Sequence, residues 1–120
     1  MKPEERKYGI YPEDILVSME RIHEYIGDLE FIQFKQKNIV VDAVIRNFEI
    51  IGEASKHIPI EIVNKYPEIP WKKMYGLRNM VSHEYFGIDY EMIWEIAKTD
   101  LSKNLLDLKK LIEIERKLWH

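Results

Sequence analysis

Apolar residues recur every three or four positions along most of this 120-residue chain, and that spacing restricts the fold more than any other feature. A repeat close to 3.6 residues places side chains on one face of an α-helix. Two clear stripes are Ile15, Leu16, Met19, Ile22 and Ile26, and Val40, Val44, Phe48, Ile51 and Ala54. The chain lacks convincing period-2 alternation, which would indicate a strand. The sequence therefore predicts an all-α fold.

Prolines and glycines predict where the helices begin and end. We expect a first helix from Pro12, a favoured first-turn residue, to Gly27, a common stop. A second should cover residues 38–57, because Pro59 prevents its continuation. A short helical turn is expected over residues 59–66.

The second half of the chain predicts two more helices. One opens at Pro70 or Trp71 and ends or bends at Gly87. The last covers residues 90–118, with a break expected near residues 99–102. Four main helices with short connections imply an antiparallel bundle. We therefore predict one domain over the whole 120-residue chain, an antiparallel bundle of four to five helices.

Composition excludes several classes of protein. An apolar content of 46% and a charged content of 32% fit a folded soluble domain. No apolar run approaches the ~20 residues of a membrane helix. The opening MKPEERKYG lacks the apolar stretch of a signal peptide, so we expect none. The absence of cysteine excludes disulfides and thiolate chemistry. A cytoplasmic location is the expectation.

The net charge of −3 counts against a nonspecific nucleic-acid coat protein but allows a local basic groove. Lys72 and Lys73 lie close to Arg78 in sequence, and Arg46 can join them in space. These three are candidate RNA-binding residues. Taken singly, each is better explained as an ordinary solvated side chain.

The octapeptide Arg78 to Tyr85 (RNMVSHEY) concentrates the chemistry of the chain. On a helix, with Arg78 at zero, Ser82 lies at ~40°, Asn79 at ~100° and His83 at ~140°. The apolar residues of this stretch fall on the opposite arc. A guanidinium, an imidazole and a phenol within eight residues suit chemistry at a phosphate. Asn79, four residues before His83, can orient the imidazole.

The angle between Arg78 and His83 leaves several explanations open. About 140° separates them on one straight helix. A distorted helix end, a bridging substrate or a second protomer would bring them together. A solvated polar face with a capping histidine is the alternative on residues alone. The chain contains a second copy of His-Glu-Tyr at residues 23–25, but Ser18 stands five residues before it, where the motif has an arginine. The arginine is therefore the informative part of the motif, and the tripeptide alone is not.

Other candidate residues lie outside the octapeptide. Gly52 lies in the middle of the second predicted helix, where glycine is less favourable than alanine by ~1 kcal/mol. A glycine at this position therefore indicates a close contact with another helix. Glu53 is either a partner for a basic site residue or a solvated carboxylate. His57 and His120 lack partners at metal-ligand spacing, so no metal site is expected.

The octapeptide matches the Arg-x4-His-x-Tyr pattern of HEPN-domain proteins, and the chain resembles their HepT-like branch. Residues 50–55 (IIGEAS) resemble that branch's Ile-Gly-Glu-Ala segment, and residues 66–71 (YPEIPW) its Pro-x-x-Pro-Trp start of the motif helix. Residues 85–89 and Trp94 match the segment that follows. The likeness covers roughly residues 40–105, which is far more specific than the short Arg-x4-His-x-Tyr pattern alone.

This resemblance implies a HEPN-like bundle that forms a homodimer, with two motif copies facing a shared cleft. It also implies a metal-independent endoribonuclease without a cofactor, acting on tRNA or mRNA. Arg78 and His83 would be catalytic, supported by Asn79, Ser82 and Glu53.

The resemblance further implies a partner. The protein would be the toxin of a toxin–antitoxin pair. Its antitoxin would be a minimal nucleotidyltransferase that transfers AMP to the motif tyrosine, which is Tyr85 here.

Two other functions remain open from the sequence. A noncatalytic helical module would recruit a nucleotidyltransferase partner or bind nucleotide or RNA, and the net charge of −3 favours it. A structural dimer would use the motif only to cap and pair helices. The intact pair of Arg78 and His83 favours the ribonuclease.

Overall fold

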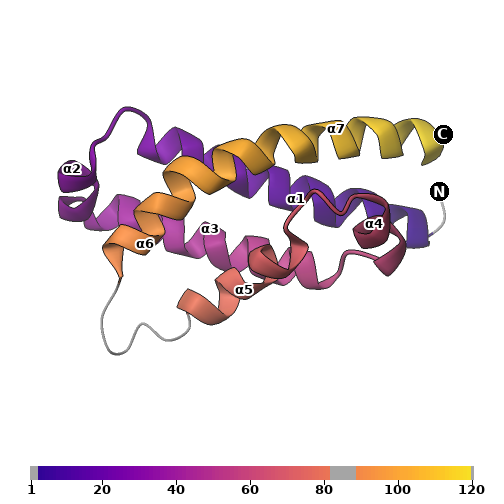
Figure 1. The fold of residues 1–120 in the computed structure, drawn as a ribbon, viewed down its shortest axis with the longest axis horizontal. Helices are drawn as coiled ribbons and strands as arrows, with labels where there is room; N and C mark the ends of the chain where they lie inside the picture. Colours follow the sequence, from indigo (N-terminus) through magenta and orange to yellow (C-terminus); the bar gives the residue numbers. More distant parts are fainter. Residues whose placement is uncertain (1–2, 82–88, 120) are drawn as a thin grey trace.

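Three long helices form the frame of the molecule. The computed structural model describes residues 3–81 and 89–119, and its longest dimension is 46 Å. Helices α1 (Pro3–Ile26), α3 (Asn38–Lys56) and α7 (Leu101–Trp119) run along this axis (Figure 1). α1 packs against both α3 and α7 and runs antiparallel to each. The start of α1 and the end of α7 therefore lie at the same end of the molecule.

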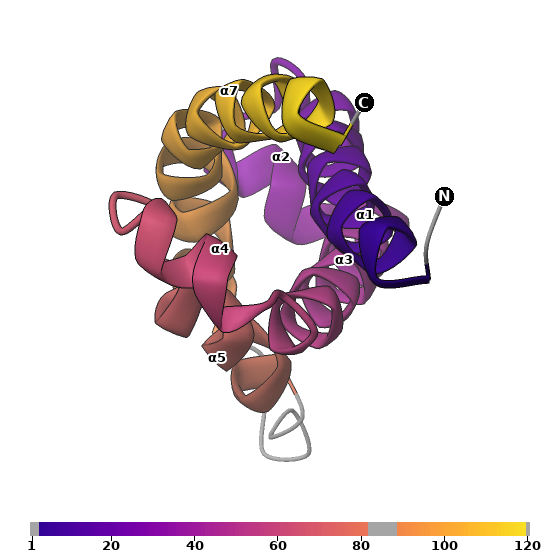
Figure 2. The same ribbon diagram turned by 90° about the vertical axis from the view of Figure 1, so that its right-hand side faces the viewer.

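The shorter helix α5 (Trp71–Val81) completes the bundle. It packs against α3, on the side away from α7 (Figure 2). This places α3 between α1 and α5. α4 (Ile60–Lys65) occupies part of the connection from α3 to α5. The predicted antiparallel helical bundle is confirmed, since the described residues contain helices and connections but no strand.

One continuous core holds these helices together. Each helix contributes the residues of its apolar stripe, and most of the predicted inward positions are buried. The fully buried side chains include Ile15, Met19, Ile22, Phe34, Val41, Val44, Phe48, Ile51, Ile69, Met74, Leu108 and Leu111. Within the described ranges, no helix has both the length and the apolar character needed to cross a membrane.

The predicted start of the first helix was wrong. α1 begins at Pro3, and Pro12 lies inside it. Proline removes one backbone hydrogen bond and disfavours a helix interior, but tertiary contacts can offset that local cost. Tyr11, next to Pro12, stacks on His57 of the chain segment after α3, with ring centroids 4.8 Å apart. That contact fixes the turn that the proline weakens.

A short helix, α2 (Phe31–Gln36), was not predicted. Six residues are too few for a visible helical period. Two local contacts support it: the side chain of Gln33 accepts a hydrogen bond from the backbone N–H of Glu30, and Phe34 is fully buried beside Trp94. Packing therefore stabilises a segment whose sequence pattern is weak.

The expected break in the last helix takes the form of a π-helical turn. α6 (Tyr90–Glu95) continues through the π turn (Ile96–Asp100) directly into α7. The predicted position, residues 99–102, overlaps the end of this turn. π turns insert an extra residue without ending the helix. The helix is therefore continuous, although its axis bends between α6 and α7, as Figure 1 shows.

A buried carboxylate ties the end of the bundle together. Glu115 of α7 is 4% exposed. It accepts hydrogen bonds from the Tyr66 hydroxyl at 2.6 Å and from Lys65 Nζ at 2.8 Å. Burial, with the hydrogen bond to Glu115, raises the pKa of Tyr66 well above its usual value. This network joins α7 to the connection that leads into α5.

Candidate active site around Arg78

Arg78 lies directly against α3 because residue 52 has no side chain. A Cβ atom placed on Gly52 would lie 2.7 Å from the Cβ of Arg78 and 2.8 Å from its backbone nitrogen. Real Cβ atoms do not approach other atoms so closely. The glycine therefore allows α5 to pack against α3 at the residue that the motif singles out. The predicted close helix contact at Gly52 is confirmed.

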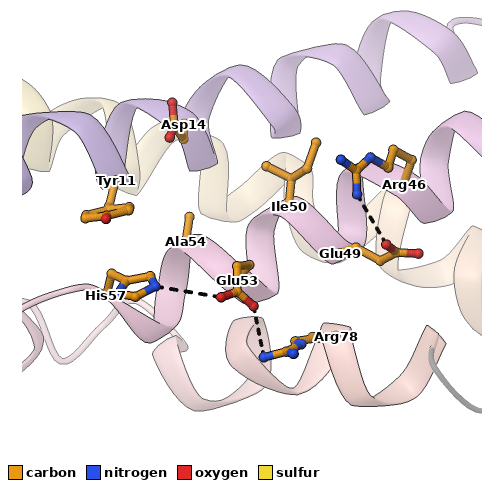
Figure 3. A pocket seen from close by; sticks show the side chains of 9 residues that line it. All are labelled: Tyr11, Asp14, Arg46, Glu49, Ile50, Glu53, Ala54, His57 and Arg78. Carbon is orange, nitrogen blue, oxygen red and sulfur yellow. Dashed lines mark hydrogen bonds and ion pairs between the residues drawn. The ribbon is translucent and has the colours of Figure 1, made fainter.

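Glu53 fixes the direction of the Arg78 side chain. Its Oε2 atom lies 2.9 Å from Nη1 of Arg78, and its Oε1 atom lies 3.7 Å from Nε2 of His57 (Figure 3). Glu53 therefore pairs with a basic residue, as one of its two interpretations has it, and the role of the pair in a site stays a prediction. The pair is about half exposed, so its contribution to stability is small and its value lies in geometry. A guanidinium has five donors, so most of the fork is free for another anion.

A cleft of ≈490 Å³ opens beside this ion pair. α1 contributes Tyr11 and Asp14 to its wall, and α5 contributes Arg78. The remaining lining residues come from α3 and its C-terminal cap, namely Arg46, Glu49, Ile50, Glu53, Ala54 and His57. Figure 3 shows these side chains along α3, between α1 and α5. The cleft combines cations, carboxylates and an aromatic pair around an apolar floor.

The described residues include only part of the predicted site. Arg78 and Asn79 are both exposed, while Met74 and Leu77 of the same helix are buried. The predicted division of this helix into a polar and an apolar face is thus confirmed for these residues. Ser82, His83 and Tyr85 lie outside the described residues, so their predicted roles stay predictions.

The three candidate RNA-binding residues do not gather in one place. Arg46 lines the cleft with Arg78 and pairs with Glu49 at 3.4 Å. Lys73 instead lines a second cavity, between α5 and the start of α7. Lys72 is exposed on α5 and lines neither cavity. The structure brings only Arg46 to the cleft of Arg78.

Several residues of the cleft were not predicted as site residues, among them His57, Tyr11 and Asp14. His57 was considered only as a metal ligand, although its position four residues after Glu53 already places the two on one helical face. Tyr11 and Asp14 belong to α1, and nothing in their local sequence indicates proximity to Arg78. Among described residues, no group of three or more His, Cys, Asp and Glu side chains is placed to hold a metal ion.

Comparison with known proteins assigns the chain to a family. A family model described as "Ribonuclease HepT-like" matches residues 15–113, which include every helix of the bundle at least in part. The chain belongs to the HepT-like family. The resemblance expected from the sequence motifs is therefore confirmed, and the helical bundle is that of a HepT-like protein.

Named relatives of this HepT-like protein extend over most of its length. It is 45% identical to "Putative RNase MJ1380" of Methanocaldococcus jannaschii, over 84% of this chain and 89% of the relative. It is 41% identical to "Probable ribonuclease HepT" of Thermococcus cleftensis, over 80% of this chain and 87% of the relative. No solved structure matches the chain significantly.

Proposed function

We propose that this HepT-like protein is a metal-independent endoribonuclease and the toxin of a toxin–antitoxin pair. The observation that carries the proposal is the fixed guanidinium of Arg78, held 2.9 Å from Glu53 at the rim of an open cleft. Family membership and the ribonuclease names of its relatives support the ribonuclease part of the proposal. The substrate is RNA, of the tRNA or mRNA class.

The reaction needs no group beyond the side chains of the motif. The 2′-oxygen of a ribose attacks the adjacent phosphorus, and the 5′-oxygen of the next nucleotide leaves. This forms a 2′,3′-cyclic phosphate and a free 5′-hydroxyl. His83 moves the proton, since an imidazole titrates near neutral pH. Arg78 stabilises the charge that develops on the phosphorane oxygens through its fork of donors.

A homodimer would complete the site. Arg78 and His83 diverge by ~140° on one straight helix. Two motif copies that face each other would allow Arg78 of one protomer and His83 of the other to meet one phosphate. The exposure of Arg78 supports this arrangement, because about half of its side chain stays open to a second chain beside its ion pair with Glu53.

Tyr85 is the proposed point of control. A minimal nucleotidyltransferase antitoxin would activate ATP so that the Tyr85 oxygen attacks the α-phosphorus and pyrophosphate leaves. The attached AMP would add negative charge and bulk to the motif, against an incoming RNA. An RNA phosphate would then meet repulsion where it now meets a cation.

A cleavage assay with chelator tests the ribonuclease. The protein, purified without its antitoxin, is incubated with tRNA and mRNA in EDTA. Cyclic-phosphate ends are expected, and both Arg78→Ala and His83→Ala should abolish them. Cleavage by His83→Ala at the wild-type rate would refute the catalytic assignment. RNA binding without cleavage by the wild type would instead identify a noncatalytic binding module.

Intact mass tests the control mechanism. Protein co-expressed with the antitoxin should carry mass increments of AMP, and Tyr85→Phe should carry none. Increments that persist in Tyr85→Phe would move the modification to another residue.

A further inference from the structure

The cleft beside Arg78 extends well past the ion pair. Its ≈490 Å³ lies in the range of sites that hold a nucleotide-sized ligand. Ile50 and Ala54 form an apolar part of its lining, and Arg46 and Arg78 provide cations. An RNA strand whose phosphate lies at Arg78 would have room for one base in this space.

An aromatic surface stands at one end of the cleft. The rings of Tyr11 and His57 are stacked, 4.8 Å apart and inclined by 21°. The His57 side chain is 44% exposed, so the stack offers a free surface. Proteins that read single-stranded RNA stack unpaired bases on such rings. The aromatic pair therefore suits a planar base.

One carboxylate in the cleft is free to read the edge of that base. Glu49 pairs with Arg46, and Glu53 pairs with Arg78. Asp14 forms no hydrogen bond or ion pair with any described residue, and it lies one turn after Tyr11 on α1. An ionised carboxylate only accepts hydrogen bonds. Guanine presents two adjacent N–H donors, N1–H and the 2-amino group, and so matches a carboxylate best.

From these observations, and on the basis of the proposed ribonuclease function, we propose that the cleft is a guanine-binding subsite. It takes the unpaired base next to the scissile phosphate. The guanine stacks on Tyr11 and His57, and its Watson–Crick edge donates to Asp14. Arg78 meets the phosphate at the other end. The subsite would give the ribonuclease a base preference that Arg78 and His83 alone cannot provide.

Direct binding tests the subsite without relying on cleavage. The His83→Ala protein is titrated into fluorescent hexauridylates whose one central base is guanine, hypoxanthine, adenine or uracil. The guanine-containing strand should bind about tenfold more tightly than the uracil strand, the gain of one bidentate contact. Hypoxanthine keeps N1–H but lacks the 2-amino group, so its strand should fall between them.

Substitutions separate stacking from edge recognition. Tyr11→Leu should weaken every strand about tenfold, the value of one stacked base. Tyr11→Phe keeps the ring and should bind as the parent does, while thermal unfolding of Tyr11→Leu shows whether that variant is folded. Asp14→Asn should remove the guanine preference alone.

Matched controls lie on the same helix or just after it. Tyr25 is an exposed tyrosine of α1 that does not line the cleft, and Asp28 is an exposed aspartate in the following turn. Tyr25→Leu and Asp28→Asn should leave all four affinities unchanged. These variants remove the same chemical groups at another place.

Three results would overturn the subsite. Equal affinities for the four strands would refute the guanine assignment. Parent-like binding by Tyr11→Leu, with binding lost in Arg78→Ala, would refute stacking while leaving the ribonuclease proposal intact. Dissociation of a dimer by Tyr11→Leu in analytical ultracentrifugation, with RNA affinity unchanged, would show that a second copy of the chain occupies the cleft. Absence of RNA binding in every variant would refute the proposed function itself.

Discussion

Arg78 packs so closely on Gly52 that a Cβ atom at residue 52 would lie only 2.7 Å from the Cβ of Arg78. This contact determines how α5 lies on α3 and therefore where the guanidinium stands. It also places the next residue, Glu53, beside the end of the Arg78 side chain. The consecutive Gly and Glu thus serve one purpose: the first admits the arginine and the second orients it.

Gly52→Ala should destabilise the protein despite the better helix propensity of alanine. Propensity alone would favour alanine by ~1 kcal/mol. The added methyl group meets backbone atoms that cannot turn away, and overpacking of this kind costs about 1–3 kcal/mol. Thermal and urea unfolding measure the change. RNA cleavage should fall as well, because Arg78 moves with α5.

Gly76→Ala is the matched control for that substitution. Gly76 also lies within a helix, but a Cβ there would meet no atom within 4 Å. We expect this variant to gain about 0.5–1 kcal/mol of stability, because alanine restricts the unfolded chain. Equal stabilities of Gly52→Ala and Gly76→Ala would show that the close contact is not a constraint.

Glu53→Gln should lower the rate of RNA cleavage without unfolding the protein. The neutral amide keeps the shape of the side chain but loses the charge that holds Arg78. A shift of about 1 Å in a catalytic group can cost as much as a hundredfold in rate. We expect a loss of about tenfold in kcat, read in single-turnover assays, with little change in melting temperature.

Glu49→Gln separates this effect from the loss of any surface ion pair. Glu49 lies on the same face of α3 and pairs with Arg46 instead of Arg78. Exposed pairs of this kind contribute little to stability. The cleavage rate of Glu49→Gln should therefore stay within about twofold of wild type. A similar loss in both variants would mean that the overall charge of the cleft matters, rather than the orientation of Arg78.

Arg78→Lys should abolish most of the cleavage although the positive charge remains. Lysine offers a single ammonium group and cannot present two parallel donors to a phosphate. Loss of one oriented donor to a developing charge costs about 10²–10³ in rate. The measurement is kcat on a defined RNA. Arg21→Lys, at an exposed position of α1, is the control and should cleave normally.

The sequence predicts the bundle and half of the site, for physical reasons that differ between residues. Burial of one helix face requires apolar residues at a regular spacing, so a long stripe such as the one in α3 can be recognised in the sequence. The contact between Glu53 and Arg78 joins residues far apart in sequence, and only Gly52 indicated it. Tyr11 reaches the cleft because α1 extends back to Pro3, past a proline that local rules take as a start. No local sequence pattern predicts that tertiary contact.

Tyr66 should make the protein lose stability at alkaline pH. Burial and its hydrogen bond to Glu115 raise its pKa in the folded state above the unfolded value of about 10. The folded protein keeps the phenol proton longer, so the stabilisation is complete below pH ~10 and declines by about 1.4 kcal/mol per pH unit above it. Urea unfolding between pH 8 and about 11.5 measures this slope.

Tyr66→Phe should be less stable at pH 8 and show a shallower decline. The exposed Tyr25→Phe should retain the wild-type slope, and an unchanged slope in Tyr66→Phe would contradict the assignment.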